Sequence, residues 1–496
     1  MIQDEKAQRY YIHTFGCQMN VHDSQRMEEV LQEGGYQKAD ELLMADLIVL
    51  NTCSVREKAE NKLRSEVGKL SKLRLHNPGL IVAVAGCVAQ QEGKKLLDTL
   101  DIDVILGPDN IRSLPELVQE RRQGFLPRVL TEFDIEAPQF LSAKPEDGFP
   151  QVGAFVTTMK GCDERCSFCI VPYTRGKERY RPKNEIIEEI KRHVMAGVKE
   201  IVLLGQTVDS YQDPSFSFVT LTHPDETHFP YLLQDIAKEV PSLKRLRYTS
   251  PHPRHTTDLL IQAHKEIDIL ARHVHLPVQS GSNRVLKRMI RRYTREEYLS
   301  RAKKLLASHP GFTLSTDVIV GFPGETESDF MDTLSLIEEV GFTSLYGFKY
   351  SRRPYTPAIK LVDDVPEQEK ESRLARLFEL AEKLTVRHLN SLVGTTQHVL
   401  FEGPSKKNAQ DAGTHPLANR CTFQGKTAQN EIVHVDVEDS LSLTGHLLQV
   451  KIIKAHRNSL RAEFLVDDFR DILAKEKGIK FATHRLLRKK LPVYRD

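Results

Sequence analysis

Residues 155–176 read FVTTMKGCDERCSFCIVPYTRG and place Cys162, Cys166 and Cys169 within eight positions. The whole chain has 496 residues but only seven cysteines. The apolar run before Cys162 predicts a buried strand, so the three cysteines fall in the loop at its carboxyl end. Active sites of α/β proteins are built at this end of the strands. The three thiols are therefore candidate ligands or catalytic groups.

The CxxxCxxC spacing favours an iron–sulfur cluster over zinc. Structural zinc takes four ligands, usually as two close pairs, and no fourth Cys or His stands near these cysteines. Three thiolates suffice for a 4Fe–4S cluster and leave one iron open to a substrate or cofactor. We expect such a cluster here. Structural zinc and a group of buried thiols are the alternatives.

Three further cysteines, Cys17, Cys53 and Cys87, follow predicted strands at spacings of 36 and 34 residues. Neighbouring parallel strands end at the same edge of a sheet, so three such loops bring their thiols together. This geometry predicts a second three-cysteine cluster. Gly16 and Gly86 precede two of the cysteines and would let the backbone approach a bulky inorganic group. The alternative is three small buried residues, since free cysteine is often buried.

The pattern of apolar runs predicts that the chain stays in a reducing compartment. No apolar run approaches the ~20 residues that span a bilayer, and the N-terminal residues lack a signal-peptide segment. We expect a cytoplasmic protein without membrane contact, in which cysteines bind metal or do chemistry. Cys421 stands alone in a β-rich part of the chain, and we expect it to be structural.

Basic residues are concentrated in two segments although the net charge is only +2. Residues 284–304 read RVLKRMIRRYTREEYLSRAKK, and residues 471–496 hold eight Lys or Arg against three acidic residues. Such segments suit a polyanion. The alternative is a solvated helix face and a frayed tail.

The pattern of apolar runs predicts a multidomain α/β protein. Strands at 10–15, 46–51, 80–86 and 101–107 alternate with helices near 22–34, 57–76 and 91–99, which predicts a parallel α/β sheet domain over 8–125. A polar connector at 132–150 and a long surface loop at 211–230 are also expected.

The central part, 148–385, repeats the strand–helix alternation six times. The predicted strands are 154–159, 200–205, 245–250, 273–278, 312–321 and 344–351, with helices clearest at 184–196, 294–308 and 326–340. Six units are too few for a closed eight-fold barrel and predict an open, partial (βα)6 barrel. Residues 388–468 are β-rich and predict a small antiparallel β-barrel, and 469–496 form a basic tail.

The two cysteine sets and the C-terminal barrel resemble the methylthiotransferase family of radical S-adenosylmethionine (SAM) enzymes. The resemblance covers roughly residues 8–468, and Phe168 matches the aromatic residue before the last cysteine of the radical SAM pattern. It rests on the motifs GCQMN, NTCSVREKA, GCVAQQEG, CSFCIVPYTRG, LPVQSGSNRVLKRM, DVIVGFPGET and VDDVPEQEK. The β-rich part resembles the TRAM domain, an RNA-binding module.

The resemblance implies two 4Fe–4S clusters and SAM, with two SAM molecules used in each turnover. Cys162, Cys166 and Cys169 would hold the SAM-binding cluster, which yields a 5′-deoxyadenosyl radical. Cys17, Cys53 and Cys87 would hold the auxiliary cluster, which carries the sulfur. All six would be catalytic. The implied reaction adds a methylthio group to carbon 2 of N6-dimethylallyladenosine next to the anticodon of tRNA.

The implied partners are the tRNA anticodon arm, an external electron donor and a sulfur donor, and we expect a monomer. By position in the family motifs, Gly205 and Gln206 are candidate contacts of the SAM amino group, and Gly321 of its adenine half. Ordinary turn chemistry is the alternative for these three.

Two positions depart from the family pattern and one has no assigned role. Thr207 stands where relatives more often have Asn, and Tyr355 where they more often have Gly. The Tyr355 departure puts in doubt the local backbone turn or the shape of the substrate mouth. Arg175 is a candidate substrate contact.

Two alternatives to this function remain at the level of sequence. Within the family, the substrate would be threonylcarbamoyladenosine in tRNA or an aspartate on a small-subunit ribosomal protein. From a different class, the chain would be a non-catalytic RNA-binding iron–sulfur protein. Formation of 5′-deoxyadenosine from SAM separates the second alternative from an enzyme.

Overall fold

The computed structural model describes residues 7–54, 57–136, 138–142, 151–215, 226–405, 420–438 and 442–465. Two units are distinguished, Met1–Thr385 and Val386–Asp496. The predicted basic tail lies outside the described residues, as do parts of the predicted connector and of the predicted surface loop.

Within the first unit, a parallel sheet has the strand order β2-β1-β3-β4-β5-β6. Its strands are β1 Arg9–Phe15, β2 Gln37–Lys38, β3 Leu47–Thr52, β4 Ile81–Gly86, β5 Val104–Leu106 and β6 Arg128–Leu130. Its helices are α1 Gln18–Glu33, α2 Glu57–Arg74, α3 Cys87–Thr99 and α4 Leu114–Arg122, with short 3-10 turns η1 Leu42–Met44 and η2 Ile111–Ser113. The predicted parallel sheet is confirmed.

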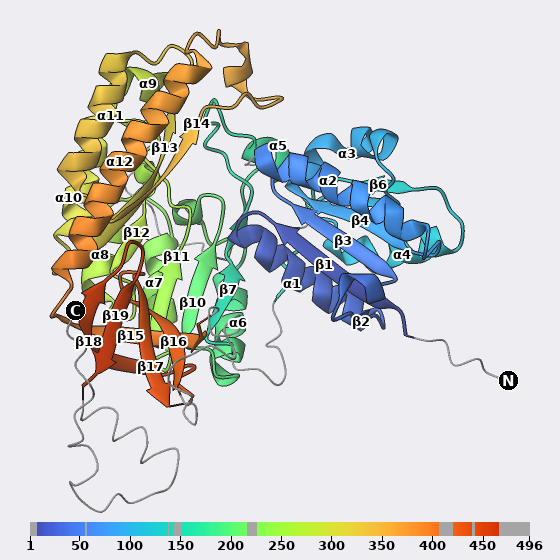
Figure 1. Ribbon diagram of the computed structural model, residues 1–496, viewed down its shortest axis with the longest axis horizontal. Helices are drawn as coiled ribbons and strands as arrows, with labels where there is room; N and C mark the ends of the chain where they lie inside the picture. The colour runs from blue at the N-terminus through green and yellow to red at the C-terminus, as the bar shows by residue number, and fades with distance from the viewer. Residues whose placement is uncertain are drawn as a thin grey trace, which may run out of the picture. The chain divides into compact units, whose positions relative to one another are not determined.

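Both faces of this sheet are buried, which explains why its strands are continuous apolar runs. In β3, Ile48 and Leu50 face a core shared with α2 and α3. Leu47 and Val49 face the opposite core, shared with α1 and α4. Figure 1 shows α2 and α3 on one side of the blue strands and α1 on the other.

Several boundaries in this sheet differ from the sequence prediction. Helix α1 begins at Gln18 rather than near residue 22, and α3 begins at Cys87 rather than near 91, with a kink at Gly93. The first turn of α1 mixes polar and apolar residues, and that of α3 continues the apolar run of β4 through Val88 and Ala89, so neither turn shows a helical period. Strands β2 and β6 were not predicted because two or three residues carry no periodic signal, and the short helix α4 was not predicted either.

The central part has the six predicted parallel strands in two sheets, β11-β10-β7 and β12-β13-β14. The strands are β7 Gly153–Thr157, β10 Glu200–Leu204, β11 Arg245–Tyr248, β12 His273–His275, β13 Thr313–Val320 and β14 Ser344–Lys349. A bridge between Leu246 and Leu270 connects the sheets, and β8 Met159–Lys160 pairs with β9 Arg179–Tyr180 outside them. The predicted partial (βα)6 barrel is confirmed.

The helices around these strands begin at side-chain caps that are visible in the sequence. Thr294 and Thr326 each form a capping box with the acidic residue three positions later, an arrangement that satisfies two free backbone N–H groups. The longer helices are α6 Lys183–Met195, α7 Phe229–Glu239, α8 Asp258–Glu266, α10 Arg295–Leu306, α11 Glu327–Val340 and α12 Glu367–Ser391. The short ones are α5 Val171–Thr174 and α9 Asn283–Arg288, with 3-10 turns η3 Val208–Ser210, η4 Pro253–His255 and η5 Pro357–Lys360.

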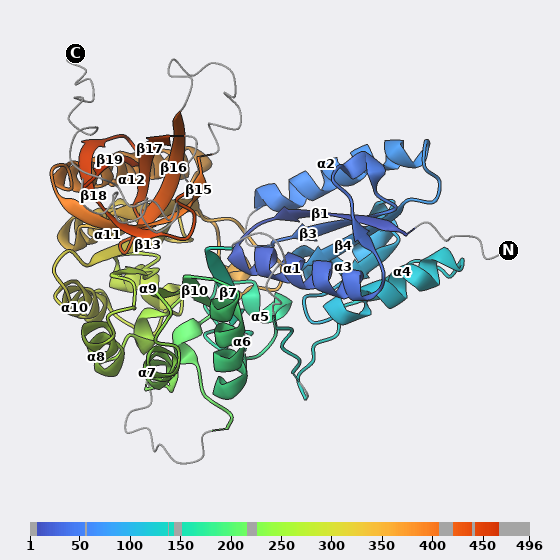
Figure 2. The same cartoon turned by 90° about the horizontal axis from the view of Figure 1, so that it is seen from below.

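The second unit is a closed barrel of strand order β15-β16-β17-β19-β18. The strands are β15 Thr396–Pro404, β16 Arg420–Thr427, β17 Ile432–Glu438, β18 Leu447–Ala455 and β19 Leu460–Phe464, and Figure 2 shows them grouped in orange and red. Four of the strand pairs are antiparallel, but β17 and β19 close the barrel as a parallel pair. Cys421 is partly buried and packs against the barrel core.

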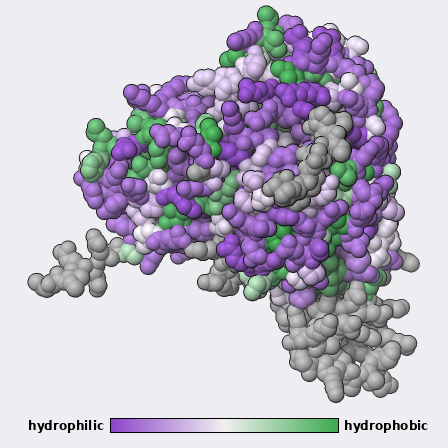
Figure 3. Space-filling model, turned by 180° about the vertical axis from the view of Figure 1, so that it is seen from behind, coloured by the Kyte–Doolittle hydropathy of each residue, from purple (hydrophilic) through white to green (hydrophobic). Residues whose placement is uncertain are grey.

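The described surface is mainly hydrophilic. Figure 3 shows one face on which hydrophobic residues are scattered in small groups. None of the described helices has the length and the apolar character needed to cross a lipid bilayer.

Gly281 of the SGSN motif has no side chain, so the backbone of helix α11 packs directly against the backbone of this loop. A Cβ atom at Gly281 would lie 2.5 Å from Thr333 Cα and 2.6 Å from the Asp332 carbonyl oxygen. Both are backbone atoms, which cannot move aside cheaply.

We predict that Gly281→Ala lowers the free energy of unfolding by about 1–3 kcal/mol, measured by urea unfolding followed by circular dichroism. The matched control is Gly68→Ala in α2, where nothing lies within 4 Å and a gain of about 0.5–1 kcal/mol is expected. Equal effects of the two substitutions would contradict the packing argument.

Candidate functional site

The register of the N-terminal sheet brings the first three cysteine loops to one edge. Phe15 pairs with Thr52, and Thr52 pairs with Gly86, so β1, β3 and β4 end level with one another. Cys53 and Cys87 follow their strands immediately, and Cys17 is separated from Phe15 by one residue, Gly16. The predicted convergence of these loops at the carboxyl edge is therefore present in the structure.

Two asparagines that the sequence analysis did not single out join the first two loops. The Asn20 Nδ2 donates to Asn51 Oδ1 at 3.1 Å, and Asn51 Nδ2 donates to the Asn20 carbonyl oxygen at 2.8 Å. Both side chains are fully buried, so the paired amides satisfy polar groups that would otherwise be costly. The only sequence signal for this pair is their place inside the quoted motifs GCQMN and NTCSVREKA.

The two predicted glycines allow these loops to approach closely. A Cβ at Gly16 (φ +136°) would lie 2.4 Å from Cys53 Cβ, and one at Gly86 (φ +91°) would lie 2.4 Å from Asn51 Oδ1. Positive φ and these contacts both exclude a side chain. The glycines therefore serve the packing of one cysteine loop against the next.

The environments of the three thiols differ. Cys17 is exposed, whereas Cys53 and Cys87 are buried. A hydrogen bond with the Cys53 thiol is the main cause that lowers the pKa of Cys17 to about 6, aided by the charge of Arg175. Burial raises the pKa of Cys87. The edge of the sheet thus favours a thiolate at Cys17.

Arg175 reaches this edge from the other cysteine loop. Its Nε donates to Cys87 Sγ at 3.2 Å, and its Nη2 donates to Asp23 Oδ2 at 2.6 Å. The Arg175 and Asp23 side chains are only 7% and 8% exposed, so the buried cation has a charged partner. Although predicted as a candidate substrate contact, Arg175 contacts a cysteine and an aspartate in this structure. Asp23 was missed because nothing in the sequence of α1 marks it.

The loop of Cys162, Cys166 and Cys169 has a polar partner for two of its sulfurs. Cys162 Sγ lies 2.9 Å from Thr207 Oγ1, and Arg291 Nη1 donates to Cys166 Sγ at 3.3 Å. Burial raises the pKa of Cys169 to about 12 and also raises the pKa of Cys162. Thr207, noted as a departure from the family pattern, thus directly contacts a cysteine.

Ser167, one of the two residues between Cys166 and Cys169, is fixed by three hydrogen bonds. Ser167 N donates to the Met289 carbonyl at 2.9 Å, its hydroxyl donates to the Arg288 carbonyl at 2.8 Å, and its own carbonyl accepts from Ala358 N at 2.8 Å. Because these partners come from the loops after β12 and β14, the cysteine loop is held by two other loops at the carboxyl edge of the barrel.

Gln206, a predicted SAM contact, has buried side-chain amide atoms without a hydrogen-bond partner among the described residues. An unpaired buried amide is costly, so this position fits a contact with a polar ligand group. Close by, the Asp209 carboxyl group is fully buried, and burial raises its pKa to about 7. Gly205 packs against Met159, where a Cβ would lie 2.7 Å from the Met159 Cγ.

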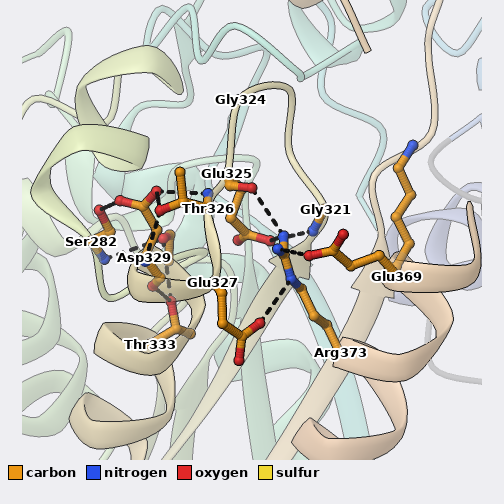
Figure 4. Close-up of polar contacts among 12 residues, drawn as sticks. Ser282, Gly321, Gly324, Glu325, Thr326, Glu327, Asp329, Thr333, Glu369 and Arg373 are labelled. Atoms are coloured by element: carbon orange, nitrogen blue, oxygen red, sulfur yellow. Dashed lines mark hydrogen bonds and ion pairs between the residues drawn. The ribbon is translucent and has the colours of Figure 1, made fainter. Parts of the chain in front are cut away.

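Gly321, the other predicted SAM contact, sits in a loop that is fixed by helix α12. Its N–H donates to Glu325 Oε2 at 2.6 Å, and the same carboxylate accepts from Arg373 Nη1 at 2.8 Å. Figure 4 shows Arg373 reaching this loop from α12, beside the capping contacts of Asp329. A Cβ at Gly321 would lie 2.3 Å from the Lys370 Cγ. This glycine therefore has a packing role, whether or not it also contacts SAM.

Backbone strain is concentrated around the cysteine loop. In the described part of the chain, seven non-glycine residues have positive φ. Six of them lie in loops of the central barrel: Arg165, Ser250, Gln279, Ile290, Arg292 and Tyr355. Residues in such sparsely populated regions gather at functional sites. The strained residues therefore mark the carboxyl edge of the barrel as a functional region, independently of its cysteines.

The basic segment 284–304 is largely engaged by the protein itself. Arg284 pairs with Asp329, Lys303 with Glu339 and Lys304 with Asp258. Its cations therefore stabilise the barrel in addition to any contact with a polyanion.

The donor sets fit multi-iron clusters better than a single ion. Among the residues that the structure describes, no group of three or more His, Cys, Asp or Glu side chains is arranged to hold one metal ion. The cysteines of a 4Fe–4S cluster each bind a different iron, so their sulfurs need not converge on one point. Two sets of three cysteines, each with a buried guanidinium next to a sulfur, suit that chemistry.

The thiol environments lead to a prediction for the metal-free protein. At pH 7, a thiol with a pKa of about 6 is about 90% thiolate, against roughly 3% for an unperturbed thiol. We expect iodoacetamide to alkylate Cys17 much faster than Cys169, with a rate that falls as the pH drops through about 6. Peptide mass spectrometry measures both rates. Cys53→Ala should shift the midpoint for Cys17 to higher pH. An unchanged midpoint would show that the hydrogen bond with Cys53 does not lower the pKa of Cys17.

Comparison with known proteins agrees with these observations. The description "Uncharacterized protein family UPF0004" matches residues 9–107, and "Radical SAM superfamily" matches residues 156–337. The tRNA-2-methylthio-N(6)-dimethylallyladenosine synthase of Sorangium cellulosum (strain So ce56) is 56% identical over 92% of this chain and 93% of that protein. The protein of the same name from Geotalea uraniireducens (strain Rf4) is 42% identical over 91% of this chain and 98% of that protein.

Among solved structures, the radical S-adenosylmethionine methyltransferase TsrM from Kitasatospora setae is 13% identical, with a TM-score of 0.48 over 79% of this chain and 81% of that chain. The identities over nearly the whole chain decide its membership: it belongs to the tRNA-2-methylthio-N(6)-dimethylallyladenosine synthase family of radical SAM proteins.

Proposed function

We propose that this protein is a radical SAM methylthiotransferase that adds a methylthio group to carbon 2 of N6-dimethylallyladenosine next to the anticodon of tRNA. The observation that carries the proposal is the 56% identity over 92% of the chain with a synthase of that name. The two separate sets of three cysteines support it, because the reaction needs both a radical and a source of sulfur.

Six cysteines would hold the two 4Fe–4S clusters. Cys162, Cys166 and Cys169 would bind the SAM-binding cluster, and Cys17, Cys53 and Cys87 the auxiliary cluster. When bound, these groups supply reductive cleavage of SAM at the first site and sulfur delivery at the second. Two SAM molecules, an external electron donor and a sulfur donor are needed for each methylthio group.

Two arginines would hold the cluster sulfurs in place. Arg175 donates to Cys87 Sγ, and Arg291 donates to Cys166 Sγ. Hydrogen bonds to cysteine sulfur stabilise negative charge on a cluster and orient its ligands. Arg291 is further fixed by donating to the Tyr293 hydroxyl and the Pro277 carbonyl, so its guanidinium is positioned before any cofactor binds.

The unpaired Gln206 amide would bind a polar group of SAM. Gly205 would bring the backbone of the same loop close to SAM, since it packs against Met159 without a side chain. Gly321 would present its loop to the adenine half. In this role the Glu325–Arg373 contacts keep the Gly321 turn in one conformation.

The substrate would be the tRNA anticodon arm, bound by a monomer in the cytoplasm. The target base has to leave its stack to reach the cysteine loops, which costs less in an RNA loop than in a duplex. The barrel of the second unit would bind the RNA backbone, as small RNA-binding barrels do.

The first test of the function is the nucleoside content of tRNA. Deletion of the gene should remove 2-methylthio-N6-dimethylallyladenosine from bulk tRNA and leave N6-dimethylallyladenosine in its place, measured by mass spectrometry. The wild-type gene should restore it, whereas a gene encoding Cys166→Ala should not. Retention of the methylthio nucleoside in the deletion strain would exclude this substrate, and loss of a methylthio-threonylcarbamoyl nucleoside would point to the other tRNA reaction.

The second test separates the two cysteine sets. In anaerobically reconstituted protein, Cys17→Ala should abolish methylthiolation but retain formation of 5′-deoxyadenosine, because only the sulfur site is disrupted. Cys166→Ala, the matched control in the other loop, should abolish both products. The wild type should hold about eight iron atoms per chain, and each variant should hold fewer. Loss of 5′-deoxyadenosine in Cys17→Ala would contradict the division of roles.

A further inference from the structure

Tyr355 exposes its ring from a strained turn. Its φ is +67°, a left-handed conformation that is uncommon for a bulky residue and that glycine adopts without cost. Its side chain is nevertheless 64% exposed, so burial of the ring does not offset the strain. Strain that the folded core does not require is typical of functional positions.

A second exposed tyrosine lies beside it. Tyr173 belongs to α5, directly after the cysteine loop, and is 44% exposed. The ring centroids of Tyr173 and Tyr355 are 6.1 Å apart with an interplanar angle of 33°. The pair comes from two loops far apart in sequence and presents aromatic surface to solvent.

This pair is anchored to the cysteine loop by backbone contacts. Ala358 N donates to the Ser167 carbonyl at 2.8 Å, between Cys166 and Cys169. Ala358 is 1% exposed and packs in a small core with Phe322 and Tyr350. The tyrosine pair is therefore fixed next to the site where the radical would form.

The turn that carries Tyr355 is basic. Residues 351–362 contain Arg352, Arg353 and Lys360 but no acidic residue. Arg352 and Lys360 are exposed, and Arg352 donates to the Ile359 carbonyl at 2.7 Å, which holds the turn together. Exposed aromatic rings among cations are the chemistry that recognises unpaired nucleobases and their phosphates.

We propose that the exposed faces of Tyr173 and Tyr355 stack on an unpaired base of the tRNA anticodon loop and so orient the loop at the cysteine site. This inference rests on the proposed function, which supplies the RNA substrate. Stacking is independent of base identity because every base has an aromatic face. The pair thus contributes affinity and placement, while the choice of the reacting base is left to the interior of the site.

The chain contains no tryptophan, so Tyr355→Trp creates a single fluorescent probe at the proposed contact. In the reconstituted holoenzyme, an anticodon stem–loop RNA that carries N6-dimethylallyladenosine should change the fluorescence of this tryptophan in a saturable manner. The matched control is Phe125→Trp, at a 55% exposed position between α4 and β6. This position precedes β6, whereas the cysteine loops follow the carboxyl ends of their strands. Phe125→Trp should not respond. A silent Tyr355→Trp in protein that binds the RNA would overturn the inference.

The second measurement compares affinity with stability. Tyr355→Gly should raise the Kd for the stem–loop by roughly 5- to 100-fold while leaving the thermal midpoint unchanged or higher, because the strained turn is relaxed. Tyr355→Phe should keep the wild-type Kd, since the ring is retained. If Tyr355 had a purely structural role, the thermal midpoint of Tyr355→Gly would instead lie below that of the wild type.

The wild-type protein separates failure of this inference from failure of the function. If it binds and methylthiolates the stem–loop but Tyr355→Gly has the same Kd, the stacking role is wrong and the function stands. If the wild type retains both clusters and neither binds nor modifies the RNA, the proposed function fails and the stacking role fails with it.

Discussion

The candidate sulfur site depends on the parallel, in-register pairing of β1, β3 and β4. Each backbone ladder fixes where the next strand ends, and the pairs Phe15–Thr52 and Thr52–Gly86 make all three end level. A shift of one residue in any pair would turn the apolar side chains of that strand to the wrong core. The packing of the two cores therefore also fixes the positions of the three thiols.

Buried charge then links this sheet to the loop of Cys162, Cys166 and Cys169. A guanidinium as deeply buried as that of Arg175 needs a negative partner, and Asp23 of α1 supplies it. Since Arg175 lies six residues after Cys169 in the sequence, its contacts with Asp23 and Cys87 fix the distance from one cysteine loop to the other. Arg291, by contrast, has a hydroxyl, a carbonyl and the Cys166 sulfur as its hydrogen-bond partners, so its charge is left to act on that sulfur.

The longer strands, the N-terminal parallel sheet and the partial barrel could be predicted because apolar runs are a local signal, and cysteine spacing likewise marks six candidate site residues. The contacts that complete the site could not. Asp23, Asn51 and Arg291 each act on a residue more than thirty positions away, and the local sequence does not reveal these partners. The short strands β2 and β6 were missed for a similar reason, since they depend on the sheet edge beside them. The parallel closure of the C-terminal barrel by β17 and β19 is also a property of the assembled strands.

The loops at the carboxyl edge of the barrel differ in whether their polar groups are satisfied, and this difference indicates which of them await a ligand. In the Gly321 loop, the Gly321 amide and the Arg373 guanidinium both donate to the Glu325 carboxylate, so protein groups hold this turn in place. In the Gln206 loop, a buried amide lacks a partner among the described residues, and at Tyr355 an aromatic ring is held out in solvent by a strained turn. The first arrangement suits a ligand with a polar group, and the second suits a ligand with a flat apolar surface. A SAM molecule and an unpaired nucleobase have those two properties, and they are the two reactants that the proposed function requires.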